Sequence, residues 1–280
     1  MSPRVVVVTD STAYLPTEVA TANEVTVVPV QVVIGGASYD EGVDITPAAV
    51  AAALRERTAV STSRPSPQRF LDVYRAAAEA GATAIVSAHL SAEMSGTGES
   101  AQLAARESPI EVIVVDSRSI AMGLGFGVLS GAAAARGGAD APSVAAIIER
   151  RAAAASAYFY VDTLEFLRRG GRIGTTQALV GSALMVKPLL SLIDGRVEPL
   201  EKVRTSGRAL NRLEDLAVMK ALEVGSDIAV HHLAATERAE LLASHLRARL
   251  PDAELIISEV GAVVGAHVGP GMVGVVISPR

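Results

Sequence analysis

Residues 4–12 have the sequence Arg-Val-Val-Val-Val-Thr-Asp-Ser-Thr. An unbroken run of β-branched apolar residues is typical of a strand buried on both faces, as in a parallel sheet. The polar residues that close the run, Thr9 to Thr12, then stand at the carboxyl end of that strand, where open α/β sheets collect their functional groups. This stretch therefore predicts a parallel α/β sheet and marks one edge of it as a candidate site.

The same pattern continues outward to about position 155. Strands are expected at residues 4–9, 25–34, 84–88 and 111–116, and helices at residues 15–23, 47–57, 67–80, 98–106, 121–136 and 143–156. Strands that are separated by helices form right-handed crossovers, which give a mostly parallel sheet with helices on its faces.

The second half of the chain has a different pattern. Asp194-Gly195 separates two apolar runs, at residues 189–193 and 197–203, and predicts a hairpin. Further strands are expected at residues 157–161, 227–233, 254–259 and 273–278, and helices at residues 206–222 and 236–250. We therefore expect an α/β domain with a parallel sheet over residues 1–155 and a smaller mixed α+β domain over residues 156–280.

Composition excludes several classes of protein. The chain has no cysteine, so disulfides, thiolate catalysis and cysteine metal sites are ruled out. The longest apolar stretch, residues 122–135, is shorter than the roughly 20 residues that a membrane-spanning helix needs. The absence of cysteine and of a signal-peptide pattern favours a cytoplasmic protein. A net charge of −5 and an aromatic content of 3% argue against nucleic acid as a partner.

Two hydroxyl-rich turns are candidate anion sites in the first half. Ser95-Gly96-Thr97 precedes an expected helix, where oriented donors and the helix dipole favour a negative group. Thr62 and Ser63 precede another expected helix. Each turn has a plainer explanation, because Ser95 or Thr97 would also serve as a helix cap, and Thr62 and Ser63 as turn formers.

Two segments of the second half remain open to more than one interpretation. Arg168, Arg169 and Arg172 surround a glycine pair, and they form either a solvated basic loop or a docking surface. His267 lies among closely spaced glycines in residues 261–271, which imply a close approach of the backbone. This histidine is either structural or part of a site. An unperturbed histidine there would titrate across roughly pH 5.5–7.5.

Familiar catalytic and metal motifs are missing. Ser95 is not in a G-x-S-x-G elbow, and the sequence contains no Walker loop or H-E-x-x-H pair. No catalytic residue, metal site or cofactor is therefore assigned.

The ordered set of these segments resembles the DegV family of bacterial fatty-acid-binding proteins. The resemblance extends through nearly the whole chain. It is carried by Thr9-Asp10-Ser11-Thr12, residues 40–45, Thr62-Ser63 with Pro65-Ser66, Leu90-Ser91, Ser95-Gly96-Thr97, residues 123–125, residues 161–165, residues 170–173, Lys187-Pro188, Asp194-Gly195, residues 202–204 and His267 with Gly269-Pro270-Gly271.

The resemblance implies two domains with one long-chain fatty acid, such as palmitate, between them. By motif position, Thr62 and Ser95 hold its carboxylate, and His267 lies near that head group. Ser63, Gly96, Thr97 and Arg64 are expected as supporting residues. Arg64 stands where glutamine is expected and Val60 where proline is expected, so Arg64 either adds a bond to the head group or faces solvent.

The resemblance also implies a role in lipid transport and fatty-acid metabolism. Some family members present their fatty acid to a kinase that phosphorylates its carboxyl group. That kinase carries the nucleotide, so no cofactor is expected here. Arg168, Arg169 and Arg172 are then candidates for docking to the kinase or to a membrane. Two enzyme alternatives remain: a phosphotransferase that uses Asp10 with Ser95-Gly96-Thr97, and a serine hydrolase that uses Ser95, His267 and Asp10 or Asp116.

Overall fold

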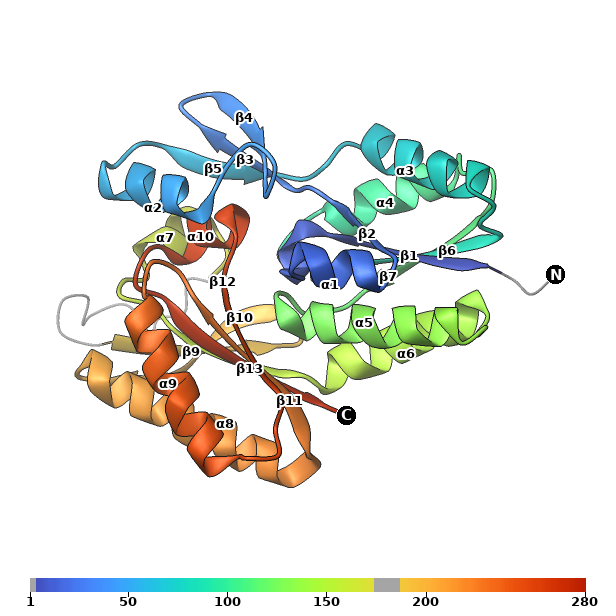
Figure 1. The fold of residues 1–280 in the computed structure, drawn as a ribbon. Helices are drawn as coiled ribbons and strands as arrows, with labels where there is room; N and C mark the ends of the chain where they lie inside the picture. The colour runs from blue at the N-terminus through green and yellow to red at the C-terminus, as the bar shows by residue number, and fades with distance from the viewer. Residues whose placement is uncertain (1–3, 174–186) are drawn as a thin grey trace. The chain divides into compact units, whose positions relative to one another are not determined.

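The computed structural model describes residues 4–173 and 187–280, and the chain divides into two compact units (Figure 1). Unit 1 comprises Met1–Gln31 and Ser63–Ala154, and unit 2 comprises Val32–Thr62 and Ala155–Arg280. Unit 2 is therefore discontinuous in sequence, because residues 32–62 pack with the second half of the chain.

A four-stranded sheet forms the centre of unit 1. Its strands have the order β2-β1-β6-β7, with β1 at Val5–Asp10, β2 at Val25–Val28, β6 at Ala84–His89 and β7 at Glu111–Asp116. Every neighbouring pair is parallel, with Val7 opposite Val25 and Val5 opposite Ala84. The parallel sheet predicted from the valine run is confirmed.

Helices cover both faces of this sheet (Figure 1). They are η1 at Ser11–Ala13, α1 at Thr17–Ala22, α3 at Pro67–Glu79, α4 at Thr97–Ala105, α5 at Met122–Arg136 and α6 at Ala141–Ala154. Phe70 and Tyr74 of α3 pack with Ile85 on one face. Leu124 of α5 and Ile148 of α6 pack on the other face. A two-sided core of this kind explains why the strands are apolar throughout.

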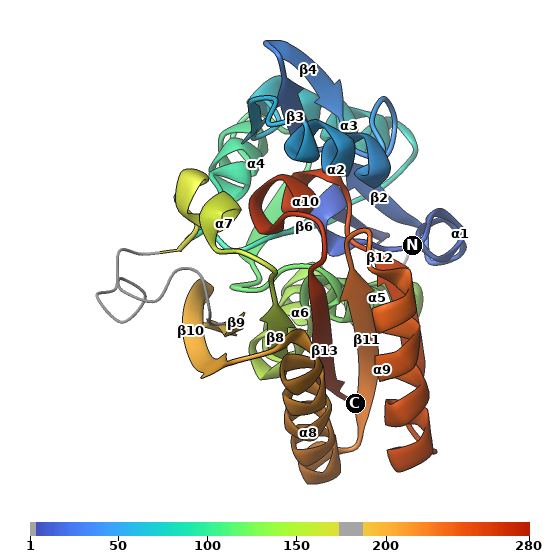
Figure 2. The same ribbon diagram turned by 90° about the vertical axis from the view of Figure 1, so that its left-hand side faces the viewer.

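Unit 2 contains a mixed six-stranded sheet. Its order is β10-β9-β8-β13-β11-β12, with β8 at Ser156–Tyr160, β9 at Lys187–Ile193, β10 at Arg196–Val203, β11 at Ser226–His232, β12 at Leu255–Glu259 and β13 at Val273–Pro279. β9 and β10 form the predicted hairpin, in which Asp194 and Gly195 both have positive φ (50° and 80°). Helices α8, Ser206–Val224, and α9, Thr236–Arg249, pack on this sheet through one apolar cluster (Figure 2).

A small three-stranded sheet and three short helices complete unit 2. The sheet has the order β4-β3-β5, with β3 at Gln31–Ile34, β4 at Ala37–Asp40 and β5 at Val60–Ser63, and only Gln31 and Ser63 fall in unit 1. The helices are α2 at Pro47–Arg55, α7 at Glu165–Arg169 and α10 at Ala262–Val268.

One sequence prediction was wrong in this region. Residues 25–34 form two strands, β2 and β3, and the two strands belong to different sheets. Pro29 lies between them and has no backbone N–H to donate to a sheet ladder, so a continuous strand is disfavoured at this position.

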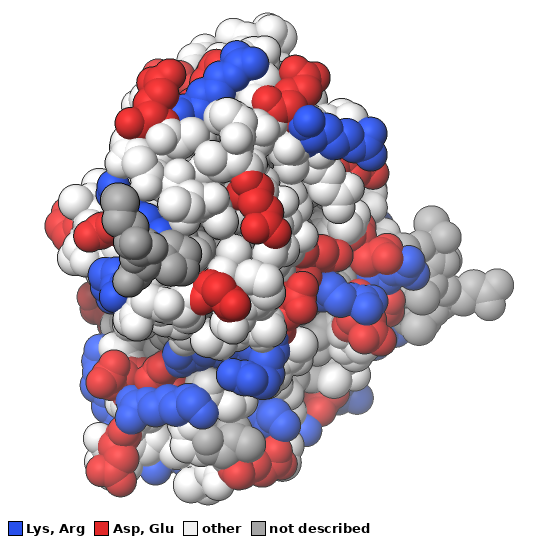
Figure 3. Space-filling model, turned by 90° about the vertical axis from the view of Figure 1, so that its right-hand side faces the viewer, with Lys and Arg blue, Asp and Glu red and all other residues white. Residues whose placement is uncertain are grey.

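Two surface properties bear on partners. Among the described residues, no helix combines the length and apolar character needed to cross a bilayer. On the face drawn in Figure 3, acidic and basic side chains are intermixed, so this face does not present a field of a single sign to a polyanion.

Candidate functional site

The first part of the candidate site is a side-chain pair within unit 2. Thr62 is in β5, and His267 is in the last turn of α10. The Thr62 hydroxyl oxygen lies 2.8 Å from Nε2 of His267 in a partly buried position. Two residues that the sequence analysis selected from distant motifs are therefore brought into direct contact by the fold of unit 2.

The surroundings of His267 keep its imidazole neutral. Burial, with a smaller contribution from the positive charge of Arg172, lowers the pKa of His267 to about 4. The titration range of pH 5.5–7.5 expected for an unperturbed histidine is therefore wrong for His267. At neutral pH the ring carries one proton, and it either donates to the Thr62 oxygen or accepts from the Thr62 hydroxyl.

The other ring nitrogen of His267 is enclosed without a hydrogen bond. Nδ1 is buried and has no hydrogen-bond partner among the described residues. It lies against the backbone at Gly170, where an added Cβ would come within 2.2 Å of Nδ1. Glycine is therefore required at position 170 for the imidazole to occupy this place. A buried polar atom without a partner reduces the stability of the fold. The ring must therefore be held in this place by its packing and by the contact with Thr62.

The second part of the candidate site is the Ser95 turn in unit 1. The Ser95 hydroxyl lies 2.9 Å from that of Thr97 and accepts a 3.3 Å hydrogen bond from the Thr97 backbone N–H. Thr97 is fully buried, whereas Ser95 is only partly buried. The N-cap of α4 is Gly96, and no side-chain hydrogen bond caps the helix there, so the expected cap by Ser95 or Thr97 is not formed. Ser95 instead makes a turn with the first helical residue and remains the more accessible of the two hydroxyls.

Arg64 lies across this turn. Its guanidinium Nη1 is 2.5 Å from the Glu99 carboxylate and 3.4 Å from the carbonyl oxygen of Gly96. A Cβ at Gly96 would come within 2.2 Å of the same nitrogen, so glycine makes room for the arginine. The Arg64 side chain is 49% exposed. Glu99 balances the positive charge of Arg64. Within unit 1 the Arg64 side chain lies against the backbone that follows Ser95.

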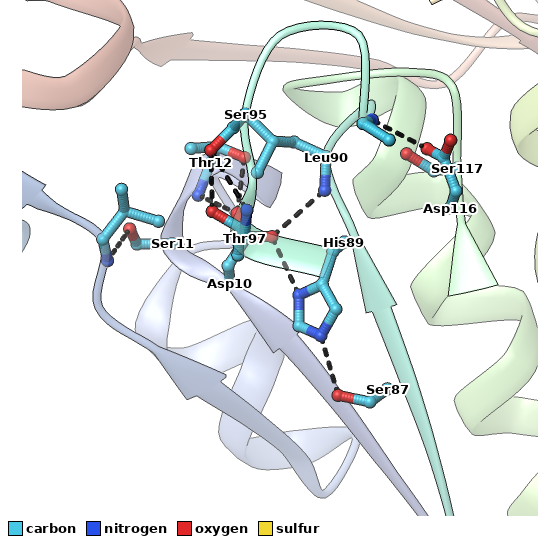
Figure 4. Close-up of polar contacts among 12 residues, drawn as sticks. Asp10, Ser11, Thr12, Ser87, His89, Leu90, Ser95, Thr97, Asp116 and Ser117 are labelled. Carbon is cyan, nitrogen blue, oxygen red and sulfur yellow. Dashed lines mark hydrogen bonds and ion pairs between the residues drawn. The ribbon is translucent and has the colours of Figure 1, made fainter. Parts of the chain in front are cut away.

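A buried polar network supports the Ser95 loop from below (Figure 4). Asp10 ends β1 and is fully buried. Its carboxylate accepts hydrogen bonds from the Thr12 hydroxyl at 2.5 Å, the Thr12 N–H at 3.0 Å and the Leu90 N–H at 3.1 Å. Nδ1 of His89 is 3.0 Å from the same carboxylate. Asp10 therefore joins the end of β1 to the beginning of the loop that carries Ser95.

The network continues away from the loop. Nε2 of His89 is 2.8 Å from the Ser87 hydroxyl, which accepts a 2.8 Å hydrogen bond from Tyr74. Burial raises the pKa of the Tyr74 phenol to about 12. Ser87, His89 and Asp10 have the connectivity of a serine-hydrolase triad, but all three are fully buried in β6 and β1, so a substrate has no access to Ser87.

Sequence reasoning missed Ser87 and His89. Only part of the signal was present, because Ser87 lies in the strand predicted at residues 84–88, whereas His89 lies just beyond it. The pairing of this strand with the one that ends in Asp10 is set by the tertiary fold. In the serine-hydrolase alternative, Ser95 would be paired with His267 and Asp10, but these two side chains have other partners. The Asp10 carboxylate is taken up by His89, Thr12 and Leu90 in unit 1, whereas His267 is bonded to Thr62 in unit 2.

Ser63 and the arginine segment have separate surroundings. The Ser63 hydroxyl donates to the side-chain oxygen of Gln31 at 3.3 Å. Arg168 and Arg169 are exposed on α7, where Arg169 pairs with Glu165 one turn earlier. Arg172 is partly buried and donates to the Gly170 carbonyl at 2.6 Å. The three arginines therefore divide into an exposed pair and one residue beside His267.

The fold and these polar groups define a two-domain α/β protein with a hydroxyl–imidazole pair and a separate hydroxyl turn. The chain belongs to the DegV family: the model of that family, described as an uncharacterised protein of the DegV family, matches residues 4–280. A DegV domain-containing protein of Streptomyces coelicolor, SCO2569, is 55% identical over 281 residues and is matched over 100% of both chains.

Two solved structures are also similar. A DegV family protein from Thermus thermophilus, described for its fatty-acid binding, is 36% identical, with a TM-score of 0.93 and coverage of 99% of this chain and 100% of that one. DegV from Bacillus subtilis, described as a fatty-acid-binding protein, is 31% identical, with a TM-score of 0.92 and full coverage of both chains.

Proposed function

We propose that this chain binds one long-chain fatty acid non-covalently and presents its carboxylate to a partner. In this proposal Thr62 and Ser95 donate hydrogen bonds to the carboxylate, and His267 orients the Thr62 hydroxyl. The observation that carries the proposal is the 2.8 Å contact between Thr62 and His267. It is supported by the two fatty-acid-binding relatives from Thermus thermophilus and Bacillus subtilis.

The tail and the carboxylate of a fatty acid contribute separately to its binding free energy. Burial of ~14 methylenes at ~0.8 kcal/mol each contributes at most ~11 kcal/mol. A hydrogen bond to a charged carboxylate contributes ~1.5–3 kcal/mol. The tail therefore dominates affinity, whereas Thr62 and Ser95 select an acid over an uncharged lipid and set its direction.

The partner in this proposal is a fatty-acid kinase, which supplies both the nucleotide and the catalysis, so the chain itself acts as a carrier without a cofactor. Arg168 and Arg169 are exposed on α7 and provide positive charge for docking to the kinase or to an anionic membrane. Arg172 was expected to share this docking role. Its position beside His267 places it closer to the proposed carboxylate contacts of unit 2.

The test begins with freshly purified protein. Denaturing extraction followed by mass spectrometry should recover roughly one fatty acid per chain, and stripped protein should bind added palmitate or oleate. A double variant, Thr62→Ala with Ser95→Ala, should retain less acid. Empty protein that also fails to bind either added acid contradicts the carrier function.

A further inference from the structure

A buried carboxylate in unit 2 lies outside the groups assigned so far. Glu41 follows β4, and its side chain is part of a residue only 5% exposed. Its Oε1 accepts a 2.7 Å hydrogen bond from the backbone N–H of Val263, 222 residues later in the chain. A buried carboxylate needs such compensation, so this long-range contact is a specific feature of the fold.

The contact is made at the start of α10. This helix begins after Gly261, whose position provides no side-chain cap, and the first N–H groups of a helix have no partner within it. Glu41 satisfies one of them from a distant segment, and its negative charge matches the positive end of the helix dipole. Val263 is one helical turn before His267, so Glu41 fixes the turn that leads into the histidine.

The same small sheet therefore holds α10 at both of its ends. Glu41 directly follows β4 and contacts the first turn of α10, whereas Thr62 in β5 contacts His267 in the last turn. β4 and β5 both pair with β3. Thr62 and His267 meet only if the helix keeps its position, to which packing against α2 and α7 and the Glu41 contact both contribute.

The turn that presents Glu41 is itself internally bonded. The Asp40 carbonyl accepts from the N–H groups of Val43 and Asp44, at 3.1 and 2.9 Å, and the Asp44 carboxylate accepts from the Asp40 N–H at 3.2 Å. Glu41 also forms a bridge with Ile45. The backbone of residues 40–45 is thus fixed before the Glu41 side chain reaches α10.

We infer that Glu41 is a positioning residue for carboxylate recognition, which it supports by holding α10 in the register that brings His267 to Thr62. This inference rests on the proposed function and names the residue that keeps its imidazole–hydroxyl pair in place. Glu41 itself does not touch the ligand.

The test compares Glu41→Ala, His267→Ala and the double variant. Affinity is measured for palmitate and for the matched alcohol, hexadecanol. Each single variant should weaken acid binding by about tenfold, while alcohol binding changes by less than about twofold, since the tail contacts are untouched. The double variant should bind the acid no more weakly than His267→Ala, because both substitutions remove the same contact.

Two further variants separate position from charge and from general loss of structure. Glu41→Gln keeps an acceptor for the Val263 N–H and should recover acid binding to within about threefold of the wild type. Glu41→Asp is too short to reach the helix and should behave like Glu41→Ala, which keeps the test open if the alanine variant does not fold. Asp140→Ala, which removes a carboxylate that accepts from the Ser143 N–H at the start of α6, is the matched control and should not change acid binding.

A readout without ligand tests the effect of Glu41 on His267 separately from the proposed function. The side-chain NMR resonances of His267 should change in ligand-free Glu41→Ala, while those of the exposed His245 stay in place. Unchanged His267 resonances, equal losses for acid and alcohol, or additive losses in the double variant each overturn the inference. Wild-type protein that binds no fatty acid overturns the proposed function, and the NMR comparison then decides the role of Glu41 alone.

Discussion

The hydroxyl of Thr62 and Nε2 of His267 lie 2.8 Å apart, although 205 residues separate them in the chain. Residues 32–62 pack with the second half of the chain and bring β5 to α10. The contact leaves one ring nitrogen of His267 buried beside Gly170 and uses the other on Thr62. A neutral imidazole in this place can orient one hydroxyl. When Nε2–H donates to the Thr62 oxygen, the hydroxyl hydrogen is left to donate to another acceptor.

Alanine at Thr62 and Ser95 should reduce the preference for an acid over an alcohol. Loss of a hydrogen bond to a charged group costs ~1.5–3 kcal/mol, so acid affinity should fall by about tenfold to a hundredfold for each hydroxyl. Binding of hexadecanol or methyl palmitate should fall less. Titration calorimetry with the three ligands measures the difference. Ser244→Ala, which removes an exposed hydroxyl of α9 that bonds its own helix, is the control. Equal losses for all three ligands would assign Thr62 and Ser95 to turn structure alone.

The depressed pKa of His267 predicts a loss of stability in acid. In the unfolded chain this histidine titrates near ~6.5, whereas in the folded chain its pKa is about 4. Between these values the unfolded state binds a proton that the folded state does not. The free energy of unfolding should therefore fall as the pH drops below ~6.5, with a contribution from His267 of about 2 kcal/mol between pH 7 and pH 5.

Denaturant unfolding at a series of pH values tests this contribution. His267→Gln should show a shallower loss of stability between pH 7 and pH 5 than the wild type. His245→Gln, at an exposed position of α9, should follow the wild-type curve. A loss in His267→Gln as steep as in the wild type would show that His267 does not contribute.

Alanine at Gly170 should displace the imidazole. Its Cβ would come within 2.2 Å of Nδ1, so the ring must move and the contact with Thr62 is strained. Overpacking of this kind costs about 1–3 kcal/mol, which thermal unfolding measures. Acid binding should weaken in parallel. Gly98→Ala is the matched control, since a Cβ there meets nothing within 4 Å and lies in α4. Equal effects of the two substitutions would contradict the proposed crowding at His267.

Removal of the positive charges of Arg168 and Arg169 should slow the transfer of a fatty acid to a membrane and leave its binding unchanged. Arg168→Gln with Arg169→Gln should hold a fatty acid as tightly as the wild type but exchange it more slowly with anionic vesicles, because each basic residue near such a surface contributes about 1 kcal/mol of attraction. Vesicle exchange at low and high salt provides the measurement, and the difference between variant and wild type should shrink at high salt. A large drop in affinity with normal exchange would reverse the assignment.

The sequence was most informative where the pattern was local. The valine run of β1 and the Asp194-Gly195 turn correctly predicted a parallel sheet and a hairpin, because strand burial and turn geometry depend on residues that are adjacent in the sequence. Prediction failed at residues 25–34, where the chain leaves one sheet and enters another. Pro29 was a local signal for a break in the strand, whereas the sheet that each half joins depends on residues far along the chain.

The candidate site shows the same limit. Motif resemblance selected Thr62, Ser95 and His267, but nothing local indicated that Arg64 pairs with Glu99 or that Glu41 reaches Val263. The glycines of residues 261–271 suggested close backbone approach, and the short helix α10 in this segment was not predicted. Helix formation there depends on packing against α2 and α7 and on a cap from residue 41, which no pattern of spacing encodes.

The interleaving of the two units has a consequence for synthesis on the ribosome. Residues 32–62 are synthesised before Ser63–Ala154, yet they belong with Ala155–Arg280, which is synthesised afterwards. The strands and helices of Ser63–Ala154 are complete before this early segment meets its partners. The apolar face of α2, which includes Val50, packs with α10, so it lacks this partner until residues 262–268 have been made. Apolar surface that stays exposed in this way makes a nascent chain prone to aggregation.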